Sequence, residues 1–138
     1  MATFKTKSTE ILEKAKTLFG KQAELIASQP KKLSALMGKV GAKIGRMASD
    51  PRIAQLLEPL GIFVRMLKAN YSGAYKISAG TIGFIVLGLV YFVSPIDIIP
   101  DFLGVLGFAD DVSVVLAIFA KLKDEVADFL EWERTSEE

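Results

Sequence analysis

The 138-residue sequence contains no cysteine and no histidine. Without cysteine, the chain forms neither disulfides nor a thiolate nucleophile. Without histidine, it lacks the usual general base, the usual ligand of transition metals and the usual switch at physiological pH. Its serines therefore have no imidazole to activate them for nucleophilic catalysis. We expect a protein that is not an enzyme.

Acidic residues are scarce in the first half of the chain, and basic residues are scarce in the second half. Residues 1–76 carry 14 Lys and Arg against 5 Asp and Glu, a net charge of +9, whereas residues 77–138 carry 3 against 11, a net charge of −8. This division favours either self-association or contact of the first half with an anionic surface. The alternative is that the basic and acidic halves of the chain pack against each other or stay solvated. Nucleic acid is not expected as a partner, because the basic half lacks interleaved aromatics and a recognisable motif.

Apolar residues are abundant, since the hydrophobic fraction is 51% and the mean hydropathy is +0.36. Both values are high for a small chain whose charged surface must cover its core. Apolar residues recur at helical spacing, which predicts an all-α fold. We expect a small membrane-associated helical protein with amphipathic N-terminal helices and an apolar helical hairpin. Its expected parts are a basic N-terminal region (1–50), a helical domain (51–134) and a tail (135–138).

The N-terminal region is predicted to contain two amphipathic helices, residues 8–28 and 31–50, separated by Pro30. In the second helix an apolar stripe consists of Leu33, Met37, Val40, Ile44 and Met47. A basic flank lies about 100° from this stripe, at 100° per residue. It consists of Lys32, Lys39, Lys43 and Arg46. The other flank is a strip of small residues that lets another helix approach closely: Ser34, Gly38, Gly41 and Gly45. We expect the basic flank to lie on an anionic membrane surface; a bundle helix with a solvated basic face is the alternative.

Asp50-Pro51 is a start signal for the next helix, because Asp suits the N-cap and Pro the first helical position. Pro59 is predicted to kink or divide this helix, and Gly73 to end it. A last amphipathic helix is predicted to follow Lys121 and to end after Trp132.

The longest uncharged stretch has 18 residues, from Ile77 to Ser94. This length is close to the roughly 20 residues that a helix needs to cross a bilayer. Tyr91 and Phe92, near its far end, suit anchors at a membrane interface. We predict that the helix from Ile77 to Val93 enters a bilayer, and a buried core helix is the alternative.

Four aspartates lie in the apolar stretch 91-YFVSPIDIIPDFLGVLGFADDVSVV-115: Asp97, Asp101, Asp110 and Asp111. Residues typical of turns and helix ends accompany them: Ser94, Pro95, Pro100, Gly104 and Gly107. The first interpretation is structural, because Ser-Pro-x-Asp has the form of a helix start with Ser at the N-cap, Pro at the first helical position and an Asp that reaches back in a capping box. The alternative is a cation or proton site, for which oxygen ligands suit Ca²⁺ or Mg²⁺ and clustered carboxylates retain a proton. No other cofactor is expected.

The motif SPIDIIPD followed by GFADD, from Ser94 to Asp101 and from Gly107 to Asp111, resembles the YkvA-like family, a bacterial domain family of unknown function. The stretches 70-NYSGAYK-76 and 126-VADFLEWE-133 also look like family features, so the resemblance covers about residues 60–134. Gly104 stands where the family usually has proline. Members are regarded as α-helical, membrane-associated proteins, and the resemblance implies the same here. It supplies no reaction, ligand or partner.

Together these features predict a non-enzymatic, membrane-associated helical module with a structural or oligomerisation role. The expected partners are the lipid bilayer with its anionic surface and a second copy of the chain. The expected location is the bacterial inner membrane, with the N-terminus in the cytoplasm according to the positive-inside tendency. One alternative is a small ion or proton transport or channel component that uses the clustered aspartates. Another is a soluble helical bundle with the apolar hairpin as its core.

Overall fold

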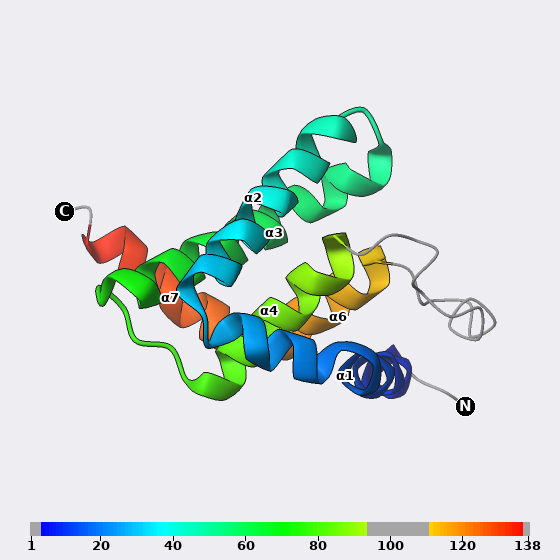
Figure 1. Ribbon diagram of the computed structural model, residues 1–138, viewed down its shortest axis with the longest axis horizontal. Helices are drawn as coiled ribbons and strands as arrows, with labels where there is room; N and C mark the ends of the chain where they lie inside the picture. The colour runs from blue at the N-terminus through cyan, green and yellow to red at the C-terminus, as the bar shows by residue number, and fades with distance from the viewer. Residues whose placement is uncertain (1–3, 94–110, 137–138) are drawn as a thin grey trace.

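The computed structural model describes residues 4–93 and 111–136, which form six α-helices and no strand (Figure 1). In chain order the helices are α1 (Phe4–Ala27), α2 (Pro30–Arg46), α3 (Pro51–Ser72), α4 (Ala79–Val93), α6 (Asp111–Lys121) and α7 (Lys123–Ser136). The prediction of an all-α fold is confirmed.

The central helix is α4, which packs against α1, α2 and α6. Every residue from Ile85 to Phe92 is buried. Such an arrangement suits a helix that is apolar on all sides, because each of its faces needs a covering surface. Ser78 begins the helix, since its hydroxyl oxygen accepts a hydrogen bond from the backbone N–H of Thr81 at 3.2 Å.

The predicted membrane helix from Ile77 to Val93 corresponds to α4, which has 15 residues. Among the described residues, no helix combines the length and the apolar character that a bilayer crossing requires. Here α4 is covered by other helices, as in the alternative interpretation of a core helix. Tyr91 and Phe92, which suit interfacial anchors by sequence, are instead core residues, 1% and 0% exposed. The ring of Tyr91 packs edge-on against Phe19 of α1, with 5.5 Å between the ring centroids.

Helix α2 has the predicted apolar stripe, with Leu33 and Val40 buried against the core. Its strip of small residues does not receive another helix within the described part of the chain. A Cβ added at Gly38, Gly41 or Gly45 would meet no atom within 4 Å. The predicted close approach along this strip is therefore not seen.

Helix α3 begins at Pro51, as predicted, and continues through Pro59 to Ser72. Pro59 does not divide the helix, although it removes one backbone hydrogen bond. Leu56, Leu60 and Phe63 are 0% exposed, and their burial offsets that loss. After Ser72, Gly73 adopts a φ of +81°, the left-handed conformation that ends many helices.

Helix α7 is joined to α3 by an ion pair, and its aromatic residues pack against Tyr75, which lies between α3 and α4. Arg65 Nε donates to Glu133 Oε2 at 2.8 Å, and Arg65 Nη2 donates to Glu133 Oε1 at 3.1 Å. These hydrogen bonds raise the pKa of Arg65; partial burial opposes the rise, and the charges of Glu133 and Glu58 add to it. Nearby, Tyr75 lies 5.4 Å from Phe129 and 5.0 Å from Trp132, measured between ring centroids.

The predicted end of the last helix, after Trp132, is too early, because α7 continues to Ser136. Arg134 forms an ion pair with Glu131 one turn earlier. The hydroxyl of Thr135 donates to the backbone carbonyl of Glu131 at 3.1 Å. These local contacts extend the helix into the expected tail.

Candidate functional site: a basic groove beside α4

Two concave grooves flank the crossing of α1 and α4. The first, which we call the lysine groove, has a volume of about 390 Å³. Its lining residues come from α1, α2 and α4: Phe19, Gln22, Leu25, Ile26, Lys32, Ala35, Leu36, Lys39, Val90 and Val93. The second, the glycine groove, has a volume of about 220 Å³. It is lined by residues of α1 and α4: Lys16, Gly20, Ala23, Glu24, Ala79, Gly80, Gly83, Phe84 and Leu87.

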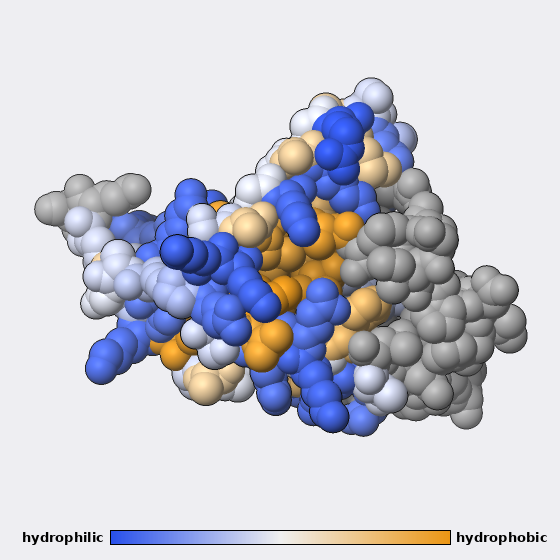
Figure 2. Space-filling view, in the orientation of Figure 1, coloured by the Kyte–Doolittle hydropathy of each residue, from blue (hydrophilic) through white to orange (hydrophobic). Residues whose placement is uncertain are grey.

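The walls of the lysine groove are mostly hydrocarbon. Phe19, Leu36 and Val90 belong to the buried core, at 7%, 4% and 2% exposure. Leu25 is 51% exposed, which makes it one of the few large apolar side chains that face solvent. Figure 2 shows apolar surface in the angle between α2 and the helices α1 and α4, with hydrophilic residues to its left and below it. A groove of this kind offers apolar surface that water covers unless a ligand binds.

The charges of the lysine groove have one sign. Lys32 and Lys39 line it and are exposed. They are seven positions apart, so both lie on one side of α2, about 10 Å apart along its axis. Among the described residues that line this groove, none is acidic. The positive end of the α2 dipole, at Pro30, adds to the attraction of an anion at the end where Lys32 lies.

Lys43 has a structural role at the end of α4. Its Nζ donates a hydrogen bond to the backbone carbonyl of Phe92 and lies 4.6 Å from the centroid of the Phe92 ring. A cation at this position satisfies a carbonyl at the C-terminal end of a helix and opposes the negative end of its dipole. Arg46 is exposed in the last turn of α2. Of the four basic residues predicted to face a membrane, only Lys32 and Lys39 line the groove.

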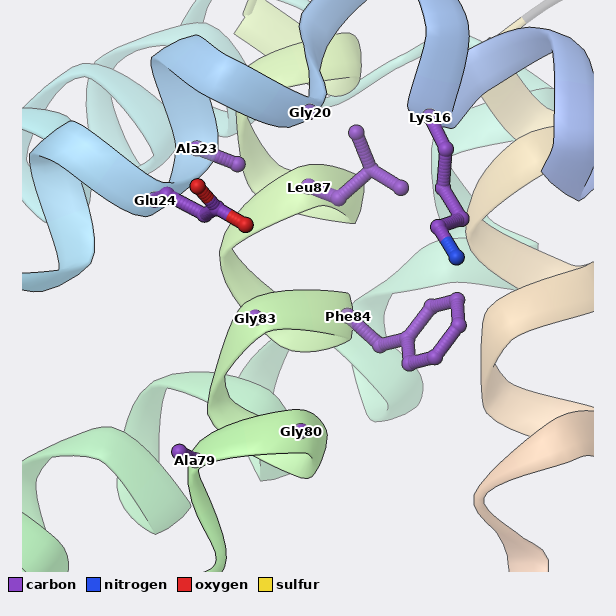
Figure 3. A pocket seen from close by; sticks show the side chains of 9 residues that line it. All are labelled: Lys16, Gly20, Ala23, Glu24, Ala79, Gly80, Gly83, Phe84 and Leu87. Carbon is purple, nitrogen blue, oxygen red and sulfur yellow. The ribbon is translucent and has the colours of Figure 1, made fainter.

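The glycine groove has mixed charge. Figure 3 shows Lys16 of α1 reaching down toward the ring of Phe84 on α4, with Glu24 in the same groove. Lys16 Nζ lies 5.6 Å from the centroid of that ring, and Lys121 Nζ of α6 lies 5.1 Å from it. These distances are in the range of cation–π interactions. A Cβ added at Gly83 would meet no described atom within 4 Å, so the floor of this groove is open.

The aspartate prediction falls mainly outside the described residues. Asp97, Asp101 and Asp110 lie there, as do the accompanying turn residues Ser94, Pro95, Pro100, Gly104 and Gly107. Asp111 is the first residue of α6, which agrees with a predicted helix start, but its side chain is not described. Within the described part of the chain, no three acidic side chains come together in a group that suits a metal ion. Both the capping interpretation and the Ca²⁺ or Mg²⁺ interpretation remain predictions.

Sequence reasoning identified Lys32 and Lys39 but missed the groove beneath them. Leu25 carried a signal, because at 100° per residue it lies about 120° from Phe19 and therefore off the apolar stripe of α1. Val90 and Val93 carried none, since both lie within the uncharged run from Ile77 to Ser94 and nothing in it marks one side of the helix. The groove forms only when three helices meet, and no local pattern contains that information.

Comparisons with known proteins agree with the motif. Residues 81–117, which include most of α4 and the start of α6, match a family described as a protein of unknown function, DUF1232. The chain is also similar to an uncharacterized membrane protein, YkvA, of Bacillus subtilis (strain 168). The two are 29% identical over 103 residues, which cover 74% of this chain and 95% of the relative. The chain contains a YkvA-like domain of unknown function. No solved structure matches this chain.

Proposed function

We propose that this YkvA-like protein is a non-enzymatic module that associates with membranes and meets anionic lipid through its α1–α2 face. The lysine groove is the observation that carries the proposal, because it combines exposed apolar walls with two exposed lysines and no acidic lining residue among those described. The chain's similarity to YkvA, an uncharacterized membrane protein, also supports association with membranes.

Exposed basic residues of α1 and α2 other than Lys16 supply the attraction: Lys21, Lys31, Lys32, Lys39 and Arg46. A basic side chain near an anionic leaflet contributes about 1 kcal/mol, so several together hold a protein at the surface. Leu25, half exposed between them, contributes apolar contact. The cytoplasmic leaflet of a bacterial inner membrane carries the anionic lipids that such a face requires.

Flotation of the full-length chain with lipid vesicles tests this proposal. Vesicles of phosphatidylcholine mixed with phosphatidylglycerol should carry the protein to the top of the gradient at low salt. Binding should fall at high salt, because salt screens exposed charges. Vesicles of phosphatidylcholine alone should carry much less. Equal binding to both kinds of vesicle, or binding to neither, contradicts the proposal.

A pair of double variants with equal net charge locates the contact. Lys32→Gln with Lys39→Gln removes the two lysines of the groove, and binding should weaken about 30-fold if each contributes about 1 kcal/mol. Lys68→Gln with Lys123→Gln removes two exposed lysines from α3 and α7 and serves as the control. If both double variants lose affinity equally, net charge alone governs binding and the α1–α2 face is not the contact.

A further inference from the structure

The lysine groove has the size and the lining of a site for a flexible apolar ligand. Its volume of about 390 Å³ falls within the range of about 300–1,000 Å³ that is common for small-molecule sites. Buried side chains of three helices, Phe19, Leu36 and Val90, form its floor and walls. Leu25 extends one wall toward solvent. A hydrocarbon chain laid against this lining would be removed from water along with the walls that it covers.

The charge at the edge of the groove selects one class of amphiphile. Lys32 and Lys39 supply two ammonium groups on α2, and no described lining residue supplies a carboxylate. The ligand's polar end should therefore be anionic. The glycine groove is a useful contrast, because both Lys16 and Glu24 line it and its charge favours neither sign.

From these observations, and resting on the proposed contact with anionic lipid, we propose that the lysine groove binds one acyl chain of an anionic membrane lipid, with the headgroup beside Lys32 and Lys39. Adsorption to a membrane by charge alone would leave the groove empty. Insertion of a chain makes binding depend on chain length, because each buried methylene strengthens it about fourfold.

Titration with soluble amphiphiles separates chain insertion from simple charge attraction. The full-length chain, with labelled methyl groups, is titrated below the micelle concentration with dodecyl phosphate and observed by NMR. Saturable binding of one molecule per chain is expected, with the largest shifts at the methyls of Leu25, Val90 and Val93. Butyl phosphate, with the same headgroup, should bind at least about 100-fold more weakly. Dodecyl maltoside, with the same chain and no charge, should also bind more weakly.

Two results overturn the proposal. One is equal affinity for butyl and dodecyl phosphate, which means that the headgroup alone binds. The other is a set of shifts at the groove methyls on simple dilution without amphiphile, which means that a second copy of the chain covers the groove.

Matched substitutions on α2 test whether the groove itself is used. Ala35 lines the groove and is exposed, so Ala35→Trp fills it and should weaken dodecyl phosphate binding at least tenfold. Ala42 is exposed two turns further along the same helix and does not line the groove, so Ala42→Trp should bind like the unmodified chain. Gln22→Phe closes the groove from α1 and must give the same loss, which covers the case that Ala35→Trp disturbs folding. Unchanged affinity in a folded filling variant excludes the groove.

The membrane proposal and the acyl-chain proposal can be contradicted independently of each other. If the chain floats with anionic vesicles but does not bind dodecyl phosphate, the acyl-chain site is wrong and the membrane proposal stands. If it binds dodecyl phosphate in the groove but does not float, the membrane proposal is wrong.

Discussion

The end of the molecule where α3 meets α7 differs from the face formed by α1 and α2. At the α3–α7 end, the aromatic rings of Tyr75, Phe129 and Trp132 pack together, and Phe129 is 0% exposed. Beside them Arg65 and Glu133 form a two-point ion pair. The three rings and this ion pair therefore contact partners within the chain, whereas Tyr71 of α3 and Leu130 of α7 are exposed, at 45% and 37%.

On the α1–α2 face, the same kinds of groups are open to solvent. Leu25 is half exposed, and Lys32 and Lys39 lie beside an apolar groove without an acidic neighbour among its described lining residues. Among the described residues, the pair of Arg65 and Glu133 joins the basic and acidic halves of the sequence at one end, whereas Lys32 and Lys39 gather on another face. The rings and the ion pair at the α3–α7 end contact partners within the protein, whereas the described lining of the lysine groove combines apolar walls with lysines and no carboxylate.

Removing Phe129 should have the largest effect on stability. Phe129→Ala deletes a fully buried ring and its aromatic contacts, and the free energy of unfolding should fall by about 3–5 kcal/mol. Leu25→Ala, at the open face, should change it by less than about 0.5 kcal/mol. Urea denaturation measures both. A similar loss of stability in the two variants would show that Leu25 is buried in solution. It would remove the contrast between the α3–α7 end and the α1–α2 face.

A second comparison concerns the two sides of α4. A Cβ at Gly88 would lie 3.1 Å from Ile118 Cδ1 of α6, whereas a Cβ at Gly83 would meet no described atom within 4 Å. Gly88→Val should therefore destabilise the fold by about 1–3 kcal/mol through overpacking. Gly83→Val should be neutral or slightly stabilising, because valine is a better helix former than glycine. Thermal denaturation measures the change in stability of each variant. An equal loss of stability in both argues against an open glycine groove.

Substitution of Lys43 should affect stability, whereas substitution of Lys39, on the same helix, should affect membrane binding. Lys43→Ala removes the hydrogen bond to the Phe92 carbonyl at the end of α4 and should cost about 1 kcal/mol of stability. Lys39→Ala should leave stability unchanged and weaken vesicle binding. Urea denaturation measures the stability of both variants, and flotation measures their binding to vesicles. Stability loss in Lys39→Ala, or none in Lys43→Ala, contradicts these assignments.

The ion pair between Arg65 and Glu133 should have the smallest effect. The side chains are 49% and 28% exposed, so a double-mutant cycle with Arg65→Ala and Glu133→Ala should give a coupling below about 1 kcal/mol that weakens as salt rises. Folding raises the pKa of Arg65. Its contribution to the stability of the fold is therefore complete below the pKa of the unfolded state, and it is lost only as pH rises through the pKa of the folded state. On the arginine side, the coupling should therefore not change near neutral pH. A coupling well above 1 kcal/mol would mean that the pair is more buried than the structure indicates.

The local signals of the sequence predicted several features correctly. Asp50-Pro51 marked the start of α3, Gly73 its end, and the spacing of Leu33 and Val40 the buried face of α2. Each depends on backbone geometry or on helical periodicity, which neighbouring residues determine.

The environment of α4 and the groove depended on residues far apart in the chain. An uncharged run such as Ile77 to Ser94 fits a bilayer or a protein core equally well, because both remove it from water. The contact of Lys43 with Phe92 spans 49 positions. Local charge patterns located Lys32 and Lys39, but the apolar walls beneath them required the packing of three helices. The role of the four aspartates stays a prediction.

The absence of cysteine makes one direct measurement simple, since a single introduced thiol can be labelled without background. Leu25→Cys places an environment-sensitive fluorophore at the lysine groove, and Ala127→Cys places it on the exposed face of α7. On addition of vesicles containing phosphatidylglycerol, the account predicts a blue shift and increased emission at position 25 and no change at position 127. A change at position 127 alone, or at neither position, would contradict the claim that the α1–α2 face meets anionic lipid.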